Sequence, residues 1–157
     1  MKKIFIILFT AILTSCGFIP MYSEQTTDIY VAPISGINGI ELRNALWAEF
    51  GNQYGPDATY TLNIQLNAPQ THYKALERTG DAAWQEISLT ATYTLKHNDK
   101  QIANGSEHAA ESYPFVSYLV ASNASYNNAV KNVIRTLSEQ ISTRIIAETY
   151  KYEHNDK

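Results

Sequence analysis

Alternating apolar and polar side chains predict two long β-strands in the middle of the chain. In residues 58–67, Tyr, Leu, Ile and Leu occupy one face, and Thr, Asn, Gln and Asn occupy the other. This is the period of two expected for a strand with one buried face. Residues 84–95 repeat the pattern, and residues 28–34 and the weaker run 101–111 are predicted as further strands. Gly105 is predicted to mark a bulge in the last of them.

Helical spacing of apolar residues predicts two helices. Residues 38–50 place their apolar side chains on one helix face. Asn38 is the expected N-cap of this helix, Glu41 is its capping-box partner, and Gly51 is placed to end it. The spacing becomes helical again from residue 123 to residue 150.

The order of these elements, strand, helix, three strands and helix, indicates the α+β class. Strands with one apolar face need helices on one side only. The sequence therefore predicts a two-layer sandwich, in which a four-stranded, mostly antiparallel sheet carries both helices on one face. Residues 97–100 are the expected hairpin turn, and the polar segment 72–81 is predicted as a long loop whose ends can continue the strands. The second sheet face, rich in Thr, Asn and Gln, is left over.

The first residues have the features of a bacterial export signal. A cationic start is followed by an apolar run at residues 4–13, which is too short to cross a bilayer. Leu13, two small residues and Cys16 then form the pattern that lipoprotein processing recognises. The alternative is an ordinary secreted protein with a free thiol, but Cys16 is the only cysteine of the chain, and such a thiol is a liability in an oxidising compartment. Cys16 is therefore predicted to carry the lipid anchor.

The predicted organisation is one folded domain behind a signal and a tether. Residues 1–15 are the signal, 16–27 the lipidated tether, 28–151 a single domain, and 152–157 a frayed polar tail. The residue after the cysteine is Gly17 rather than Asp, which favours the periplasmic side of the outer membrane. The mature chain of 142 residues has 10 basic and 15 acidic side chains, a balance that argues against nucleic-acid binding.

The start of the mature chain resembles that of the LPS-assembly lipoproteins (LptE-like), the small lipoprotein partner of the outer-membrane LPS translocon. Members begin with Cys-Gly-Phe followed by Pro-Leu-Tyr, and residues 16–22 read Cys-Gly-Phe-Ile-Pro-Met-Tyr. The family's two Ala-x-Tyr-x-Leu strands are matched at residues 58–62 and 91–95, and its long C-terminal helix is matched around Ile141 and Arg144. The similarity extends over nearly the whole mature chain, although the individual motifs beyond residue 22 are short.

This resemblance implies a non-enzyme that sits as a plug inside a large outer-membrane β-barrel, helps to assemble it, and takes part in delivering LPS to the outer leaflet. The Thr/Asn/Gln sheet face and the polar loop could meet the polar barrel interior. Basic residues near the strand loops are implied to contact LPS phosphates, and the candidates are Lys74, Arg78, Lys96 and Lys100. Each of these surfaces could also be simply solvated.

The residues give no separate indication of catalysis, and no cofactor or metal is expected. The four histidines are scattered without metal-ligand spacing or a second cysteine, and no nucleophile elbow or phosphate-binding glycine loop is present. His108, flanked by Glu107 and Glu111, is the best acid–base candidate. Two alternatives to the plug remain: a periplasmic lipoprotein adaptor of another envelope complex, and a lipid-anchored hydrolase.

Overall fold

The computed structural model describes residues 28–155, except 52, 54, 77–81 and 116–117. The predicted lipidation residue, Cys16, and one LPS-contact candidate, Arg78, lie outside the described residues. In chain order, the elements are β1 (Ile29–Val31), α2 (Ile37–Glu49), β2 (Tyr60–Leu66), β3 (Gln70–Leu76), β4 (Ala82–His97), β5 (Lys100–Pro114) and α3 (Leu119–Asn155). Neither described helix is long and apolar enough to cross a membrane.

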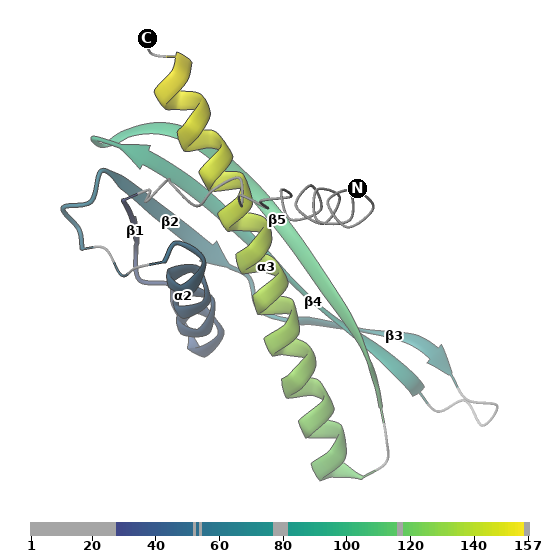
Figure 1. The fold of residues 1–157 in the computed structure, drawn as a ribbon. Coiled ribbons are helices and arrows are strands. Elements are labelled where there is room, and N and C mark those ends of the chain that lie inside the picture. Colours follow the sequence, from purple (N-terminus) through teal and green to yellow (C-terminus); the bar gives the residue numbers. More distant parts are fainter. Residues whose placement is uncertain (1–27, 52, 54, 77–81, 116–117, 156–157) are drawn as a thin grey trace, which may run out of the picture.

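Strand β4 organises the sheet, because it is hydrogen-bonded on both sides (Figure 1). Antiparallel β5 pairs with residues 84–97 of β4 on one side. On the other side, antiparallel β2 pairs with residues 91–97 of β4 and antiparallel β3 with residues 82–88. Strand β1 adds to β2 in parallel, across the connection made by α2. The predicted α+β class and mostly antiparallel sheet are confirmed.

The sheet has five strands rather than the predicted four, because β3 forms within the segment predicted as a long loop. His72 pairs with Glu86, and Gln70 pairs with Ser88. The described side chains of β3 are exposed up to Lys74, so the strand carries no apolar alternation by which it could be recognised in the sequence. Backbone hydrogen bonds to β4 hold it in place instead.

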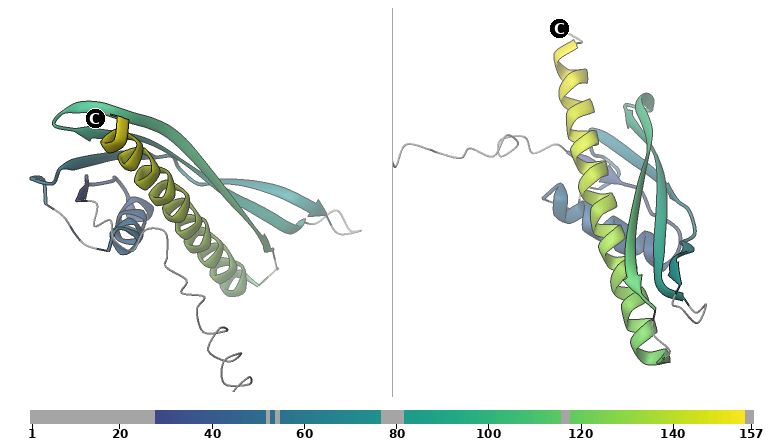
Figure 2. Two further views of the ribbon diagram at one scale, coloured as in Figure 1. Left: turned by 45° about the horizontal axis from the view of Figure 1, so that its top comes forward. Right: turned by 90° about the vertical axis from the view of Figure 1, so that its right-hand side faces the viewer.

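Both helices pack on one face of the sheet, as predicted, and the core lies between the two layers (Figure 2). Helix α3 runs along β5 and β4, and α2 packs beside α3. The core is built from side chains that alternate on β2 and β4 and recur at helical spacing on α2 and α3. Its largest fully buried members include Leu42, Leu46, Leu62, Ile87, Leu89, Leu95, Leu137, Ile141 and Ile145.

The ends of the helices differ from the prediction in two places. Helix α2 begins at Ile37 with Gly36 as its N-cap, at φ 84° and without a side-chain cap, so the assignment of Asn38 as N-cap was wrong. A left-handed backbone at Gly36, which glycine adopts without a steric cost, starts the helix instead. The predicted stop is confirmed, since Gly51 has φ 75° directly after the last turn.

Helix α3 is longer than predicted at both ends. It extends through Asn155, so most of the predicted polar tail is helical, and only residues 156–157 lie outside the described part. The added turns are held by ring contacts, because the Tyr152 ring packs edge-on against the His97 ring, with centroids 5.3 Å apart. Contact with the sheet thus supplies the stability that the polar sequence lacks.

The hairpin between β4 and β5 is confirmed at the predicted residues. Asn98 and Asp99 both have positive φ, 49° and 63°, as the two central residues of a type I′ turn require. The bulge predicted at Gly105 is wrong: the one register shift between β4 and β5 leaves out Ile102. Gly105 instead makes room for the ring of Tyr93, its partner on β4, because a Cβ at Gly105 would lie 2.6 Å from Tyr93 Cζ.

We expect Gly105→Val to lower the free energy of unfolding by about 1–3 kcal/mol, because the added side chain must displace the buried Tyr93 ring. Urea unfolding followed by circular dichroism measures the change. The matched control is Ser106→Val on the exposed face of the same strand, which should change stability by less than about 0.5 kcal/mol. Equal stability of Gly105→Val and wild type would contradict the packing of Tyr93 over β5.

Candidate interaction surfaces

No described helix or strand covers the second face of the sheet. The alternation that buries one side of β2, β4 and β5 under the helices turns the other side outward (Figure 2). We call this surface the open face. Its exposed side chains on these strands are small and polar for the most part: Asn63, Gln65, Thr92, Asn104, Ser106, His108, Ala110 and Ser112. Such a surface offers many hydrogen-bond donors and acceptors and few charges.

The sheet separates His108, the best acid–base candidate of the sequence, from the two carboxylates that flank it in the chain. His108 lies on the open face, where its Nδ1 is 3.1 Å from Thr90 Oγ1. Its sequence neighbours Glu107 and Glu111 lie on the helix side, where Glu107 is 3.7 Å from Arg144 and Glu111 accepts a hydrogen bond from Asn132 at 3.3 Å. The three side chains therefore form no catalytic group. No cluster of metal-ligating residues occurs in the described ranges either.

The described candidates for LPS contact, Lys74, Lys96 and Lys100, lie at two opposite ends of the sheet. Lys74 lies on β3, beside the start of β4, and forms an ion pair with Glu86 at 3.0 Å. Lys96 and Lys100 lie at the other end of β4, next to the hairpin turn. At the rise of a β-strand, these two positions are more than about 30 Å apart. A single phosphate group therefore cannot contact both positions.

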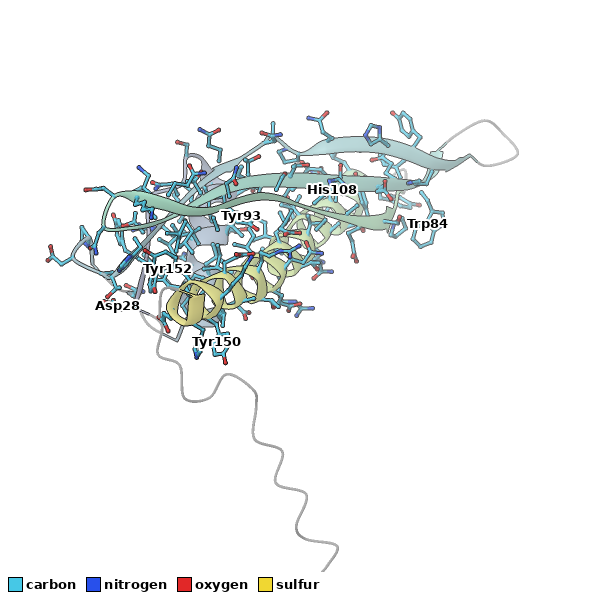
Figure 3. The ribbon with its side chains drawn as sticks, turned by 90° about the horizontal axis from the view of Figure 1, so that it is seen from above. Asp28, Trp84, Tyr93, His108, Tyr150 and Tyr152 are labelled. Atoms are coloured by element: carbon cyan, nitrogen blue, oxygen red, sulfur yellow. The ribbon has the colours of Figure 1, made fainter. Side chains whose placement is uncertain are left out.

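Exposed aromatic and aliphatic side chains gather at the end of the sheet that holds Lys74. We call this the far end. Trp84 projects there from the start of β4 (Figure 3) and is 47% exposed, and Tyr73 on the adjacent β3 is 71% exposed. Phe115, after β5, and Tyr118, just before α3, are exposed as well. The sequence did not reveal this group, because its members lie in four segments that only the strand register brings to one end.

The opposite end, where the folded domain begins, is closed by contacts between the sheet and the end of α3. We call it the tether end, and Figure 3 shows Asp28, Tyr150 and Tyr152 there. Asp28 accepts hydrogen bonds from the backbone N–H of Thr59 at 3.0 Å and from its hydroxyl at 3.2 Å. The Tyr60 hydroxyl donates to Glu153 Oε1 at 3.0 Å. Burial and the neighbouring Glu153 carboxylate raise the pKa of Tyr60 to about 12.

These features define an α+β domain with one sheet face covered by two helices and one open sheet face. The sequence profile of the LptE family, described as lipopolysaccharide-assembly, matches residues 26–147, so the chain belongs to this family. A comparison with curated protein sequences gives no match.

Several solved lipoprotein structures are similar to this chain. Rare lipoprotein B from Shewanella oneidensis superposes with a TM-score of 0.64 at 14% identity, covering 80% of this chain and 98% of that one. A candidate lipoprotein from Caulobacter crescentus has the same TM-score at 17% identity, with 80% and 91% covered. A minor lipoprotein from Acinetobacter baumannii has a TM-score of 0.59 at 17% identity, with 78% and 93% covered. At these identities, the likeness shows the fold.

The family membership predicted from residues 16–22 and the strand motifs is therefore confirmed by a match that lies almost entirely within the folded domain. The chain therefore belongs to a family of LPS-assembly lipoproteins, and this family is not enzymatic. The open face, the far end and the tether end are the surfaces through which such a protein can act.

We expect the stabilising effect of the Tyr60 hydroxyl to disappear in alkaline solution. A phenol with a pKa of 10.0 when unfolded and about 12 when folded stabilises the folded state fully below pH 10 and loses this effect as the pH rises to 12. Below pH 10, Tyr60→Phe should be less stable than wild type by about 1 kcal/mol, the value of one hydrogen bond. Urea unfolding at several pH values should show this difference shrinking between pH 10 and 12.

Glu153→Gln is the matched control for the tyrosine, because it removes the charge that raises the pKa of Tyr60 and keeps the size of the side chain. In this variant the pH-dependent loss should be smaller, although burial, the larger cause, remains. A difference between Tyr60→Phe and wild type that stays constant up to pH 12 would contradict the assignment.

Proposed function

We propose that the chain is anchored through Cys16 on the periplasmic side of the outer membrane and fills the lumen of a large β-barrel as a plug. In this position it assists the assembly of the barrel and the delivery of LPS to the outer leaflet. The observation that carries the proposal is the open face, since the interior of an outer-membrane barrel is polar and hydrogen-bonding. A sheet that presents Asn, Gln, Ser and Thr side chains without a covering layer is suited to such a wall.

The position of the proposed lipid anchor indicates how the domain is oriented inside the barrel. Eleven residues lie between Cys16 and Asp28, so the proposed lipid attachment site can lie no more than about 40 Å from the start of the domain. Asp28 belongs to the tether end, as do Lys96 and Lys100. We therefore expect the tether end to face the periplasmic mouth of the barrel and the far end to reach furthest into it.

Recovery of the barrel partner is the direct test. The chain, tagged at its C-terminus, should recover an outer-membrane β-barrel of the LPS-assembly type from solubilised membranes, and depletion of the chain should lower surface LPS and destabilise that barrel. Recovery of a different envelope complex would favour the adaptor alternative. Unchanged surface LPS after depletion would contradict the plug, and a hydrolytic activity of the purified chain would favour the lipid-anchored hydrolase.

We expect Thr92→Trp to reduce barrel recovery at least about tenfold, because a bulky ring in the middle of the open face holds the sheet away from the wall. A tenfold loss corresponds to about 1.4 kcal/mol of binding free energy. The control is Asp57→Trp, which places the same ring in an exposed loop near the tether end and should leave recovery near the wild-type level. Equal recovery by both variants would show that the open face is not the contact.

The candidate cations lead to a second prediction, which concerns the binding of purified LPS to the chain. We expect only one of the double variants Lys74→Ala/Arg78→Ala and Lys96→Ala/Lys100→Ala to weaken binding, because one phosphate group cannot reach both ends of β4. The variant with all four changes should then bind as weakly as the sensitive pair alone. Similar, additive losses from both pairs would contradict a single phosphate site.

A further inference from the structure

The outer side of β5 is the longest unpaired strand edge in the described structure. β5 has 15 residues and pairs only with β4 among the described strands. It forms the outer margin of the sheet, with α3 covering its inner face (Figure 1). The N–H and C=O groups along such an edge are ready to pair with another strand.

The hydrogen bonds of β4 identify which backbone groups of β5 point outward. Asn67 N–H donates to the Thr90 carbonyl at 3.0 Å, so Thr90 turns its backbone toward β2 and β3. Because backbone groups alternate in direction along a strand, the odd-numbered residues of β4 turn toward β5 and bond to their partners there, such as Glu107 and Ala109. The outward residues of β5 are therefore Asn104, Ser106, His108, Ala110 and Ser112.

The other sheet edges carry features that discourage further pairing, and this edge does not. β1 has only three residues, and β3 has two register shifts and the charged Lys74. Between Gln101 and Tyr113, β5 contains no proline, lysine or arginine, and its one bulge lies near its start. Its two carboxylates are directed toward α3, where they meet Arg144 and Asn132.

We propose that the outer edge of β5 pairs with an extended segment of the barrel partner, which adds one strand to the sheet. The inference rests on the proposed function. The edge is continuous with the open face, because the outward backbone groups belong to the residues whose side chains line that face. Small side chains such as Ser106 and Ala110 leave a second backbone room to approach. Hydrogen bonds to the main chain then fix the position of the plug, as in other cases of strand addition.

Amide hydrogen exchange at single-residue resolution tests the pairing directly. The probe is the complex of the tagged chain with its co-purified barrel, compared with the free chain. In the complex, the outward amides of Ser106, His108 and Ala110 should exchange at least about tenfold more slowly, while the inward amides of Glu107 and Ala109 are protected in both states. If the outward amides exchange equally fast in the complex and in the free chain, the inference is overturned and the plug proposal still stands.

A proline substitution provides the second measurement. Ala110→Pro removes an outward N–H and no hydrogen bond to β4, so an edge strand should tolerate it. Ala110→Val is the matched control, since it enlarges the side chain and keeps the N–H. We expect the proline variant to recover at least about tenfold less barrel than the valine variant, with unchanged circular dichroism.

Three other results of these experiments would overturn the proposed strand pairing. Equal recovery by Ala110→Pro and Ala110→Val would overturn the strand pairing. A dimer of the free chain in native mass spectrometry that Ala110→Pro dissociates would show that a second copy occupies this edge, and it would overturn the barrel segment as the occupant. If the wild-type chain recovers no barrel, the proposed function fails and the inference fails with it.

Discussion

The packing of α3 against β4 and β5 is the interaction on which the rest of the structure depends. The helix buries Leu137, Ile141 and Ile145 completely. β5 contributes less apolar volume in return, since its inward positions include Gly105, Glu107 and Ala109, and its large buried ring, Tyr113, lies near its end. The helix and β4 therefore supply most of the apolar surface that holds β5. The opposite sheet face carries polar side chains, so it is stable without such a cover.

Whether the sequence predicted an element depended on which interaction holds that element in place. β2 and β4 were recognised because each buries one face, and burial leaves an alternating pattern in the side chains. β3 was missed because backbone hydrogen bonds to β4 hold it, and these leave no trace in side-chain polarity. The start of α2 was misplaced because Gly36 sets it through its backbone conformation, whereas sequence reasoning looks for a capping side chain.

The candidate functional residues also differ in how far the sequence alone could predict them. Cys16 was predicted from a local motif, since a processing enzyme reads an extended segment of consecutive residues. The basic residues were recognised by type, but their grouping depends on strand register, which places Lys74 at one end of β4 and Lys96 at the other. The exposed aromatic residues of the far end were missed for the same reason. Spatial neighbours contributed by separate strands cannot be identified before the pairing of those strands is known.

A protein with its unsatisfied polar groups concentrated on one side needs a polar surrounding on that side. The open face presents side-chain donors and acceptors, and the β5 edge adds backbone groups that alternate with those bonded to β4. Hydrocarbon could not satisfy these groups, because each unpaired polar group buried there costs several kcal/mol. Water satisfies them but fixes no orientation. The proposed barrel wall, with its own hydrogen-bonding groups, would do both. It would hold the sheet at one register, while the lipid proposed at Cys16 would limit how far the domain can move from the membrane.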